Sequence, residues 1–282
     1  EFRRVLFRSG ETANSCRLEE CLLKASDMIG WKEKGMRTVM PDGKIRARGV
    51  AMAMQGSSIS NCDVGSVTVK LSDEGTYHIT VGCTDMGTGC DTIIAQFAAD
   101  VLETPIDNIS VYGVDTDISP YDSGSYASST TYLTGMAAVK ACEQLRERII
   151  ALAAVRMNKD ASALTFDGEN VIDESDGAKM SLFDIATASM CNNEISLEVT
   201  YSHSSPVSPP PFMAACAEIE ADPETGAIEL LDYTACVDCG TVVNTNLARV
   251  QTEGGLLQGI GMTLYEDIWY DEIGRASCRE RV

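Results

Sequence analysis

The stretch TDMGTGCDTIIAQFAADVL, residues 84–102, joins a glycine-rich turn to the start of a helix. The apolar stretch just before it, YHITVGC at residues 77–83, predicts a strand. After the turn the apolar residues follow a helical period, with Ile94, Ala98 and Leu102 on one face. A strand, a glycine turn and a helix N-terminus in this order place small residues where unpaired amide groups can approach a phosphate.

Working outward, the same patterns predict an α+β chain with mixed sheets and packed helices. The predicted helices are Leu18 to Trp31, residues 93–102, Thr131 to Met157 and Leu247 to Tyr265. The predicted strands are 49–54, 66–71, 77–83, 108–114, 163–171, 197–202, 216–221 and 228–236, the last two forming a hairpin. Arg37 to Arg48 is polar and marked by glycine and proline, which favours a connector, while 115–129 reads as a loop and 204–211 as a linker.

Two further segments place small residues where a loop enters a helix. They are GSYASSTT, residues 124–131, and QTEGG, residues 251–255. Hydroxyl groups in the first of them would add donors for an anion. Ordinary helix capping is the alternative explanation for each loop taken alone. A nicotinamide site is disfavoured because position 92 is Thr, where the dinucleotide fingerprint has its third glycine, and neither a Walker motif nor a Gly-x-Ser-x-Gly elbow occurs.

Composition excludes several classes of function. The 282 residues carry a formal net charge of −20, which repels nucleic acid. The longest apolar run, 149–155, is far short of the roughly 18 residues of a membrane span. Only two histidines are present, which excludes a multi-histidine metal centre, and the 11 cysteines are irregularly spaced. A single Cys-x-x-Cys, residues 236–239, has no second pair, so we expect reduced thiols in a reducing cytoplasm.

The two ends differ in composition from the acidic interior. Residues 1–9 and 272–282 are rich in arginine, and their back-translation resembles read-through of a sequencing adapter. We therefore interpret both as adapter-derived scars and the chain as a fragment. Between them, residues 10–45 are interpreted as a helical lead-in segment and connector, and residues 46–271 as the main domain.

Five stretches together resemble the molybdenum-binding subunit of the xanthine dehydrogenase and aldehyde oxidase family. They are RGVAMAM (48–54), TDMGTGCDT (84–92), SGSYASSTTYLTGMAAVKAC (123–142), EIEADPETGAIELL (218–231) and VDCGTVVNTNLARVQTEGGLLQGIGMTLYED (237–267). They occur in the order and spacing of the family. The resemblance implies the C-terminal half of the molybdopterin-binding region, in its second domain.

The resemblance also implies which residues form a site. The cofactor-binding residues would be Gly87, Thr88, Gly89, Ala127, Ser128, Ser129, Thr130 and Gln251. Thr88 stands where the family has a glutamine. Ala127 would lie near the molybdenum without being a side-chain ligand, and Met52 and Ala53 would line the substrate channel. We expect a larger side chain at position 127 to block the site without disturbing the fold.

The implied function is that of a molybdenum hydroxylase acting on a purine, another N-heterocycle or an aldehyde. The implied cofactor is molybdopterin with molybdenum, in the cytosine dinucleotide form, and 2Fe-2S and FAD partner domains or subunits would accept the electrons. The catalytic glutamate of the family would lie beyond Asp271, so we expect no catalytic residue in this chain and no activity of the chain alone. The alternative is a non-catalytic relative that binds the cofactor or scaffolds partner subunits.

Overall fold

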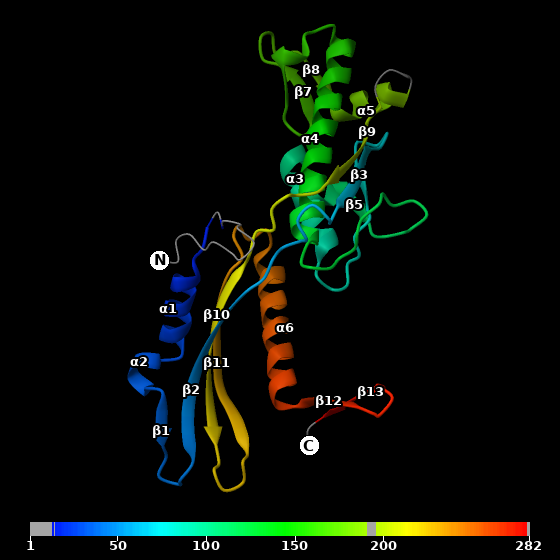
Figure 1. Ribbon diagram of the computed structural model, residues 1–282. Helices are drawn as coiled ribbons and strands as arrows, with labels where there is room; N and C mark the ends of the chain where they lie inside the picture. The colour runs from blue at the N-terminus through cyan, green and yellow to red at the C-terminus, as the bar shows by residue number, and fades with distance from the viewer. Residues whose placement is uncertain (1–12, 14, 191–195, 281–282) are drawn as a thin grey trace. The chain divides into compact units, whose positions relative to one another are not determined.

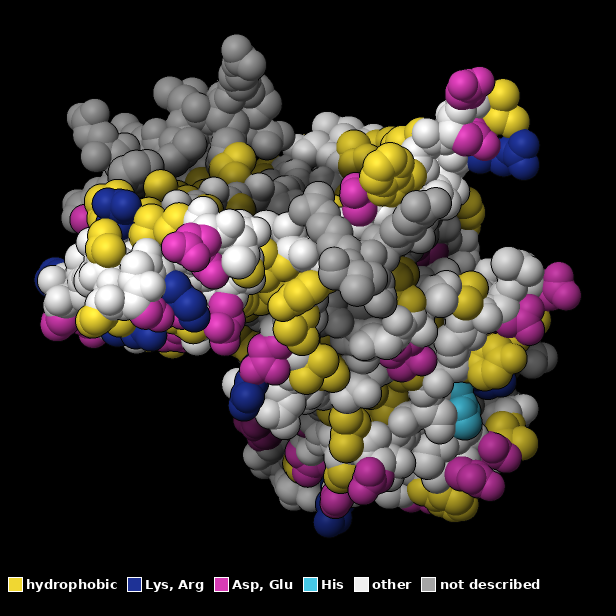
Figure 2. All heavy atoms as spheres, turned by 90° about the horizontal axis from the view of Figure 1, so that it is seen from below, with side chains coloured by type: hydrophobic (Ala, Val, Ile, Leu, Met, Phe, Trp, Pro, Cys, Tyr) yellow, Lys and Arg dark blue, Asp and Glu magenta, His cyan; other side chains and the backbone are white. Residues whose placement is uncertain are grey.

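The computed structural model describes residue 13, residues 15–190 and residues 196–280. The chain divides into two compact units, Glu1–Gly240 and Thr241–Val282, and each is described by itself. The adapter-like residues 1–9 lie outside the described residues. No helix in the described ranges combines the length and the apolar character that crossing a membrane requires. Figure 2 shows Asp and Glu side chains scattered over one face, in keeping with the net charge of −20.

The first unit contains a four-stranded antiparallel sheet in the order β1-β2-β10-β11 (Figure 1). Its strands are β1 (Arg37–Val39), β2 (Ile45–Met54), β10 (Phe212–Ala221) and β11 (Ile228–Asp238). Helix α1 (Leu18–Met28) packs on β10 and β11, where Ala25 and Ile29 are buried against Cys216. The short helix α2 (Trp31–Lys34) follows α1. The predicted first helix and the predicted hairpin are thereby confirmed.

The predicted connector over Arg37 to Arg48 is wrong, because β1 and the start of β2 lie there. The polar residues that suggested a connector are paired across the sheet. Arg46 lies opposite Glu220, and its Nε donates to a Glu220 carboxylate oxygen at 2.8 Å. Opposite charges on facing strands stabilise the pairing, and the two residues are 174 positions apart. No local pattern could therefore have shown that this segment is a strand.

A buried ion pair lies beside this one in the same sheet. The Arg48 and Glu218 side chains are 4% and 6% exposed, and Arg48 Nη2 donates to Glu218 Oε1. Arg48 also donates to the backbone oxygens of Lys34 and Gly35, and Lys34 Nζ lies 2.8 Å from Glu218 Oε2. Burial alone would raise the pKa of Glu218, but the hydrogen bonds from Lys34 and Arg48 hold that pKa below its usual value.

The segment between β2 and β10 forms a second sheet, in the order β5-β4-β3-β9. Its strands are β3 (Gly65–Leu71), β4 (Tyr77–Val81), β5 (Ile109–Tyr112) and β9 (Glu198–His203), with β4 and β5 parallel and the other pairs antiparallel. Helices α3 (Cys90–Leu102) and α4 (Thr130–Met157) pack on each other, α4 contacts β3 and β9, and α3 contacts β5 (Figure 1). The α+β class predicted from the sequence is confirmed.

Helix α4 carries the apolar face predicted for it, and that face lies in the core. The predicted residues Leu133, Ala137, Ala141, Leu145, Ile149 and Leu152 are all buried. Near its N-terminus the helix approaches β3 closely. A Cβ atom at Gly65 would lie 2.6 Å from the Thr134 amide nitrogen and 2.7 Å from its Cα. Because no real Cβ comes that near to backbone atoms, only glycine permits this contact.

The prediction of a single strand over residues 163–171 is also wrong, because these residues belong to a small third sheet. Residues 163–171 do not form one strand but two, β6 (Leu164–Phe166) and β7 (Asn170–Asp173), joined by a turn at Gly168. Gly168 has a φ of +90°, and a Cβ atom there would lie 1.9 Å from the Glu103 carbonyl oxygen. The remaining elements near it are η2 (Ile106–Asn108), η3 (Ala161–Ala163), β8 (Lys179–Ser181) and α5 (Leu182–Met190).

The second unit consists of helix α6 (Thr245–Leu264) and a hairpin of β12 (Glu266–Tyr270) and β13 (Ala276–Glu280). The Asn244 side chain caps α6 by accepting from the Leu247 amide at 3.0 Å. The predicted last helix is confirmed to within two residues at its start. Strand β13 lies in the segment that we interpret as adapter-derived, and that interpretation stays a prediction.

We expect Gly65→Ala to destabilise the protein by about 1–3 kcal/mol, because the added methyl group must displace the α4 backbone. Urea denaturation monitored by circular dichroism measures the change. Gly49→Ala is the matched control, since a Cβ atom at Gly49 would meet nothing within 4 Å. Equal stability of the two variants would contradict the close packing of α4 on β3.

We expect Arg48→Met to cost about 3 kcal/mol at pH 7, because it leaves the buried Glu218 carboxylate with Lys34 alone. The lowered pKa of Glu218 means that its contribution is present above the unfolded pKa and is lost as the pH falls through the folded pKa. Denaturation curves should therefore show the largest difference from the original chain above about pH 5 and a shrinking one below about pH 4. Arg46→Met, whose side chain is 40% exposed, should change stability much less at both pH values.

Candidate functional site

The loop between β4 and α3 contains the predicted residues Gly87, Thr88 and Gly89. The Asp85 carboxylate closes this loop by accepting from the Gly87 amide at 2.9 Å, the Gly89 amide at 3.0 Å and the Asp91 amide at 3.4 Å. Burial alone would raise the pKa of Asp85, but these amides hold it below its usual value. The expectation that this loop offers the amides of Gly87 and Gly89 to an anion is therefore wrong. The backbone at Gly87 is open on one side, since a Cβ atom there would meet nothing within 4 Å.

The loop before α4 differs from the loop 84–89 in its backbone conformation. Ala127 and Ser128 both adopt left-handed backbone conformations, with φ values of +50° and +57°. Two consecutive non-glycine residues in this region are uncommon, and each costs of the order of 1–3 kcal/mol unless its surroundings hold it. Ser129 is the N-cap residue of α4, but its side chain makes no capping hydrogen bond. Side-chain capping by Ser129 therefore does not explain the serines here, and among the described residues no carboxylate accepts a hydrogen bond from the first amides of α4.

Hydrogen bonds bring three of the predicted segments together. The Ser125 hydroxyl accepts from the Thr84 amide and donates to the Thr84 carbonyl, each at 3.0 Å, which joins the two loops. The Ser58 amide donates to the Ala127 carbonyl at 2.9 Å. Gln55, directly after β2, donates from Nε2 to the Ser128 hydroxyl at 2.8 Å. The end of β2, the loop 84–89 and the loop 124–130 thus meet at one place in the first unit.

The other predicted residues are placed as follows. Met52 and Ala53 lie on the exposed end of β2, with Met52 51% exposed. Ser129 is buried and Thr130 begins α4. Gln251 lies on an exposed part of α6, in the second unit, and is described there by itself. Beside it on the same helix, Cβ atoms at Gly254 and Gly255 would meet nothing within 4 Å, so the backbone there is open.

Sequence reasoning missed two residues that hold the second loop. The buried Asp63 accepts a 2.6 Å hydrogen bond from the Tyr126 hydroxyl and a 2.7 Å one from the Ile59 amide. Ser58 is 6% exposed with a φ of +113°, and its hydroxyl has no hydrogen-bond partner in the described ranges. Neither residue has a sequence signal, because both act through a loop more than 60 positions away. Asp85 did have one, since an aspartate just before a glycine turn commonly binds the turn amides.

Comparison with known proteins identifies the class of site. Residues 24–279 match the family model described as "Molybdopterin cofactor-binding domain". The chain therefore belongs to the molybdopterin-binding domains of the xanthine dehydrogenase and aldehyde oxidase family, as the sequence resemblance predicted.

Curated relatives within this family include several named oxidoreductases. The chain is 36% identical over 270 residues to "Probable hypoxanthine oxidase XdhD" of Escherichia coli, covering 95% of this chain and 28% of that protein. It is 28% identical over 272 residues to the xanthine dehydrogenase molybdenum-binding subunit of Escherichia coli, covering 93% and 36%. It is 30% identical over 234 residues to the nicotine 6-hydroxylase large subunit of Paenarthrobacter nicotinovorans, covering 79% and 28%. The chain thus spans about a third or less of the length of these relatives.

Solved structures show the same fold. The CO dehydrogenase of Oligotropha carboxidovorans superimposes with a TM-score of 0.79 at 24% identity, over 95% of this chain and 36% of that one. Quinoline 2-oxidoreductase from Pseudomonas putida superimposes with a TM-score of 0.80 at 23% identity, over 94% and 36%. At this identity the likeness establishes the fold alone.

The left-handed backbone at position 127 bears on the expected effect of bulk there. A β-branched residue is strained at positive φ, so part of the effect of valine would fall on stability, and the expectation that the fold is otherwise undisturbed stays a prediction. We expect Ala127→Val to destabilise the protein by about 1–3 kcal/mol in thermal or urea denaturation, and Ala127→Gly to be tolerated. Ala163→Val, at an exposed alanine without positive φ, is the control and should stay within about 0.5 kcal/mol. If valine were tolerated equally at both positions, the left-handed conformation would be refuted.

Proposed function

We propose that this chain holds a molybdenum–pterin cofactor in an enzyme that hydroxylates a purine, another N-heterocycle or an aldehyde. The observation that carries the proposal is the loop before α4, where Ala127 and Ser128 are held in left-handed conformations beside an N-terminus without a side-chain cap. Such strain is maintained only where neighbouring contacts enforce it, and it is concentrated at binding sites. The named relatives act on substrates of these classes, among them hypoxanthine and nicotine.

The chemistry of the residues in these loops is compatible with such a cofactor. The first turn of α4, with Ser129 and Thr130, would bind the cofactor phosphate groups through backbone amides. The small side chain of Ala127 would leave room for the metal centre, which it does not ligate. Thr88, between Gly87 and Gly89, would contact the pterin edge rather than a phosphate, because Asp85 already occupies the neighbouring amides. When bound, the cofactor supplies two-electron oxidation and reduction chemistry, whereas this chain binds and orients it.

The remaining assignments belong to the same proposal. Gln251 would hydrogen-bond the pterin from α6, and Met52 and Ala53 would line the path of the small-molecule substrate. We assign the binding role to residues 46–271. The cofactor would be the cytosine dinucleotide form, and 2Fe-2S and FAD domains or subunits would accept its electrons in the cytoplasm. In keeping with this, the nicotine 6-hydroxylase and CO dehydrogenase relatives are named as a large subunit and a large chain.

We expect Gln251→Ala, made in the complete enzyme that contains this segment, to lower the molybdenum content of the purified protein. Losing one hydrogen bond costs roughly 0.5–1.5 kcal/mol, which corresponds to about a 2- to 13-fold loss of cofactor affinity. The measurement is metal analysis together with the melting temperature. Gln258→Ala is the matched control, because Gln258 is also an exposed glutamine on α6.

Three outcomes are distinguishable. Lower molybdenum in Gln251→Ala alone, with an unchanged melting temperature, supports the proposed contact. Equal molybdenum content in both variants would indicate that Gln251 faces solvent and does not contact the cofactor. An enzyme that binds molybdenum normally but oxidises no purine, N-heterocycle or aldehyde would favour the scaffolding alternative.

A further inference from the structure

One aromatic side chain lies where the three segments of the candidate site meet, and the proposed function assigns it no role. Residues 48–58, 84–92 and 123–131 contain a single aromatic residue among them, which is Tyr126. It directly precedes Ala127, the residue that is proposed to leave room for the metal centre. Tyr126 is 43% exposed, so its ring is available to a ligand.

The Tyr126 ring is held at two points. Its hydroxyl donates to Asp63 Oδ1 at 2.6 Å, and Asp63 is itself 1% exposed and accepts the Ile59 amide at 2.7 Å. The hydrogen bond to Asp63 raises the pKa of Tyr126, so the hydroxyl keeps its proton at neutral pH. A Cβ atom at Gly124 would lie 3.2 Å from Cδ1 of the ring, which places one ring edge against the Gly124 backbone. A ring fixed in this way loses little conformational entropy when a ligand packs on it.

A second observation at the same place points to a ligand. Ser58 donates its amide to the Ala127 carbonyl at 2.9 Å, and its own carbonyl accepts from the Ser208 hydroxyl at 2.8 Å. Ser58 is 6% exposed, and its hydroxyl has no hydrogen-bond partner in the part of the chain that the structure describes. Leaving a buried hydroxyl unpaired is costly. A ligand that carries a polar atom beside this hydroxyl would remove that cost.

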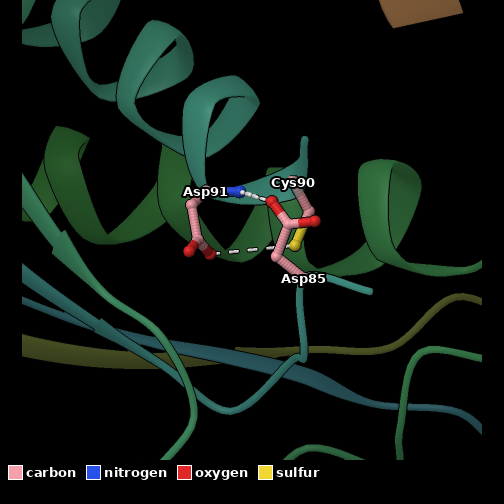
Figure 3. Close-up of side chains that lie close together, drawn as sticks. All are labelled: Asp85, Cys90 and Asp91. Carbon is pink, nitrogen blue, oxygen red and sulfur yellow. Dashed lines mark hydrogen bonds between the residues drawn. The ribbon is translucent and has the colours of Figure 1, made fainter. Parts of the chain in front are cut away.

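The side chains at the ends of the loop 84–89 are used within that loop (Figure 3). Asp85 accepts the Asp91 amide at 3.4 Å, and Cys90 Sγ lies 3.8 Å from Asp91 Oδ1. The segment 84–92 contains no aromatic residue. Among the three segments of the candidate site, contact with a flat ring therefore falls to Tyr126.

We propose that Tyr126 is the surface on which the substrate stacks, and that the substrate is accordingly a planar N-heterocycle such as a purine. This inference rests on the proposed function, because it concerns the same site and narrows the class of substrate. Stacking on an aromatic side chain favours flat π-systems, whereas a small aliphatic aldehyde has no ring to stack. Tyr126 determines specificity in this proposal and takes no part in the redox chemistry.

The test compares purine with acetaldehyde in the complete enzyme that contains this segment. Equilibrium dialysis of purine against the chemically reduced enzyme measures binding without turnover, and steady-state kinetics gives KM and kcat for both compounds. Tyr126→Ala should weaken purine binding and raise the KM for purine roughly 5- to 150-fold, the loss expected when a base-stacking side chain is removed. The KM for acetaldehyde and the molybdenum content should stay unchanged.

Three further variants complete the test. Tyr126→Phe keeps the ring and should keep most of the purine binding. Tyr126→Leu keeps apolar bulk without a ring and should behave as Tyr126→Ala does, so it provides the result if the alanine variant fails to fold. Tyr121→Ala is the matched control, because Tyr121 also lies between β5 and α4 and is 75% exposed, and it should bind purine as the original enzyme does.

The outcomes separate this inference from the proposed function. Unchanged purine binding in both Tyr126→Ala and Tyr126→Leu would overturn it, and so would an equal loss in Tyr121→Ala or an equal rise of KM for purine and acetaldehyde. An original enzyme that contains molybdenum and oxidises acetaldehyde but binds no purine would refute the substrate class and leave the cofactor proposal standing. An original enzyme without molybdenum would refute the proposed function, while the dialysis of purine would still decide the role of Tyr126.

Discussion

The close approach of α4 to β3 at Gly65 is the constraint on which the first unit depends. The backbone of Thr134 can lie so near to the strand only because Gly65 has no side chain. From that point the helix runs along the sheet with its apolar face buried, and its N-terminus is held against the strand ends. The Thr134 hydroxyl donates to Asp122 at 3.0 Å, and Asp122 accepts the Gly124 amide, which fixes the start of the candidate loop. A packing contact in the core thus helps to fix where the loop 124–130 lies.

The two loops of the candidate site resemble each other in sequence but differ in what they offer a ligand. Both are rich in small residues and both precede a helix. In the first, the Asp85 carboxylate accepts the amides that an anion would need. In the second, Asp122 accepts the Gly124 amide near the start of the loop and the Thr134 hydroxyl, and the Ser129 side chain makes no capping hydrogen bond to α4. One aspartate therefore accounts for the difference in how the backbone amides of the two loops are used.

The sequence predicted local features well and non-local ones poorly. The helical period identified α3, α4 and α6, because side chains three and four positions apart decide which face is buried. The start of strand β2 was missed because its arginines are polar and gave no strand pattern. They fit a strand only because they form ion pairs with Glu218 and Glu220 on the neighbouring strand. The family resemblance named the loop at Ala127, but its left-handed backbone is enforced by Ser58 and Gln55, which no local pattern connects to it. The missed features are those set by partners far away in the chain.

The long-range pairing of β2 with β10 also bears on the order in which the chain folds. Arg48 and Glu218 are 170 positions apart, so joining them in an unfolded chain costs about 4.5 kcal/mol of loop-closure entropy, plus a constant. The segment between the two strands has its own hydrophobic core, built from α3, α4 and the sheet of β3, β4 and β9. Once that segment has folded, the ends at Gln55 and Pro211 are already close, since the Gln55 amide donates to the Pro211 carbonyl at 3.4 Å. The route with the lower entropy barrier is therefore one in which the inserted segment folds first and the sheet of β1, β2, β10 and β11 is completed last.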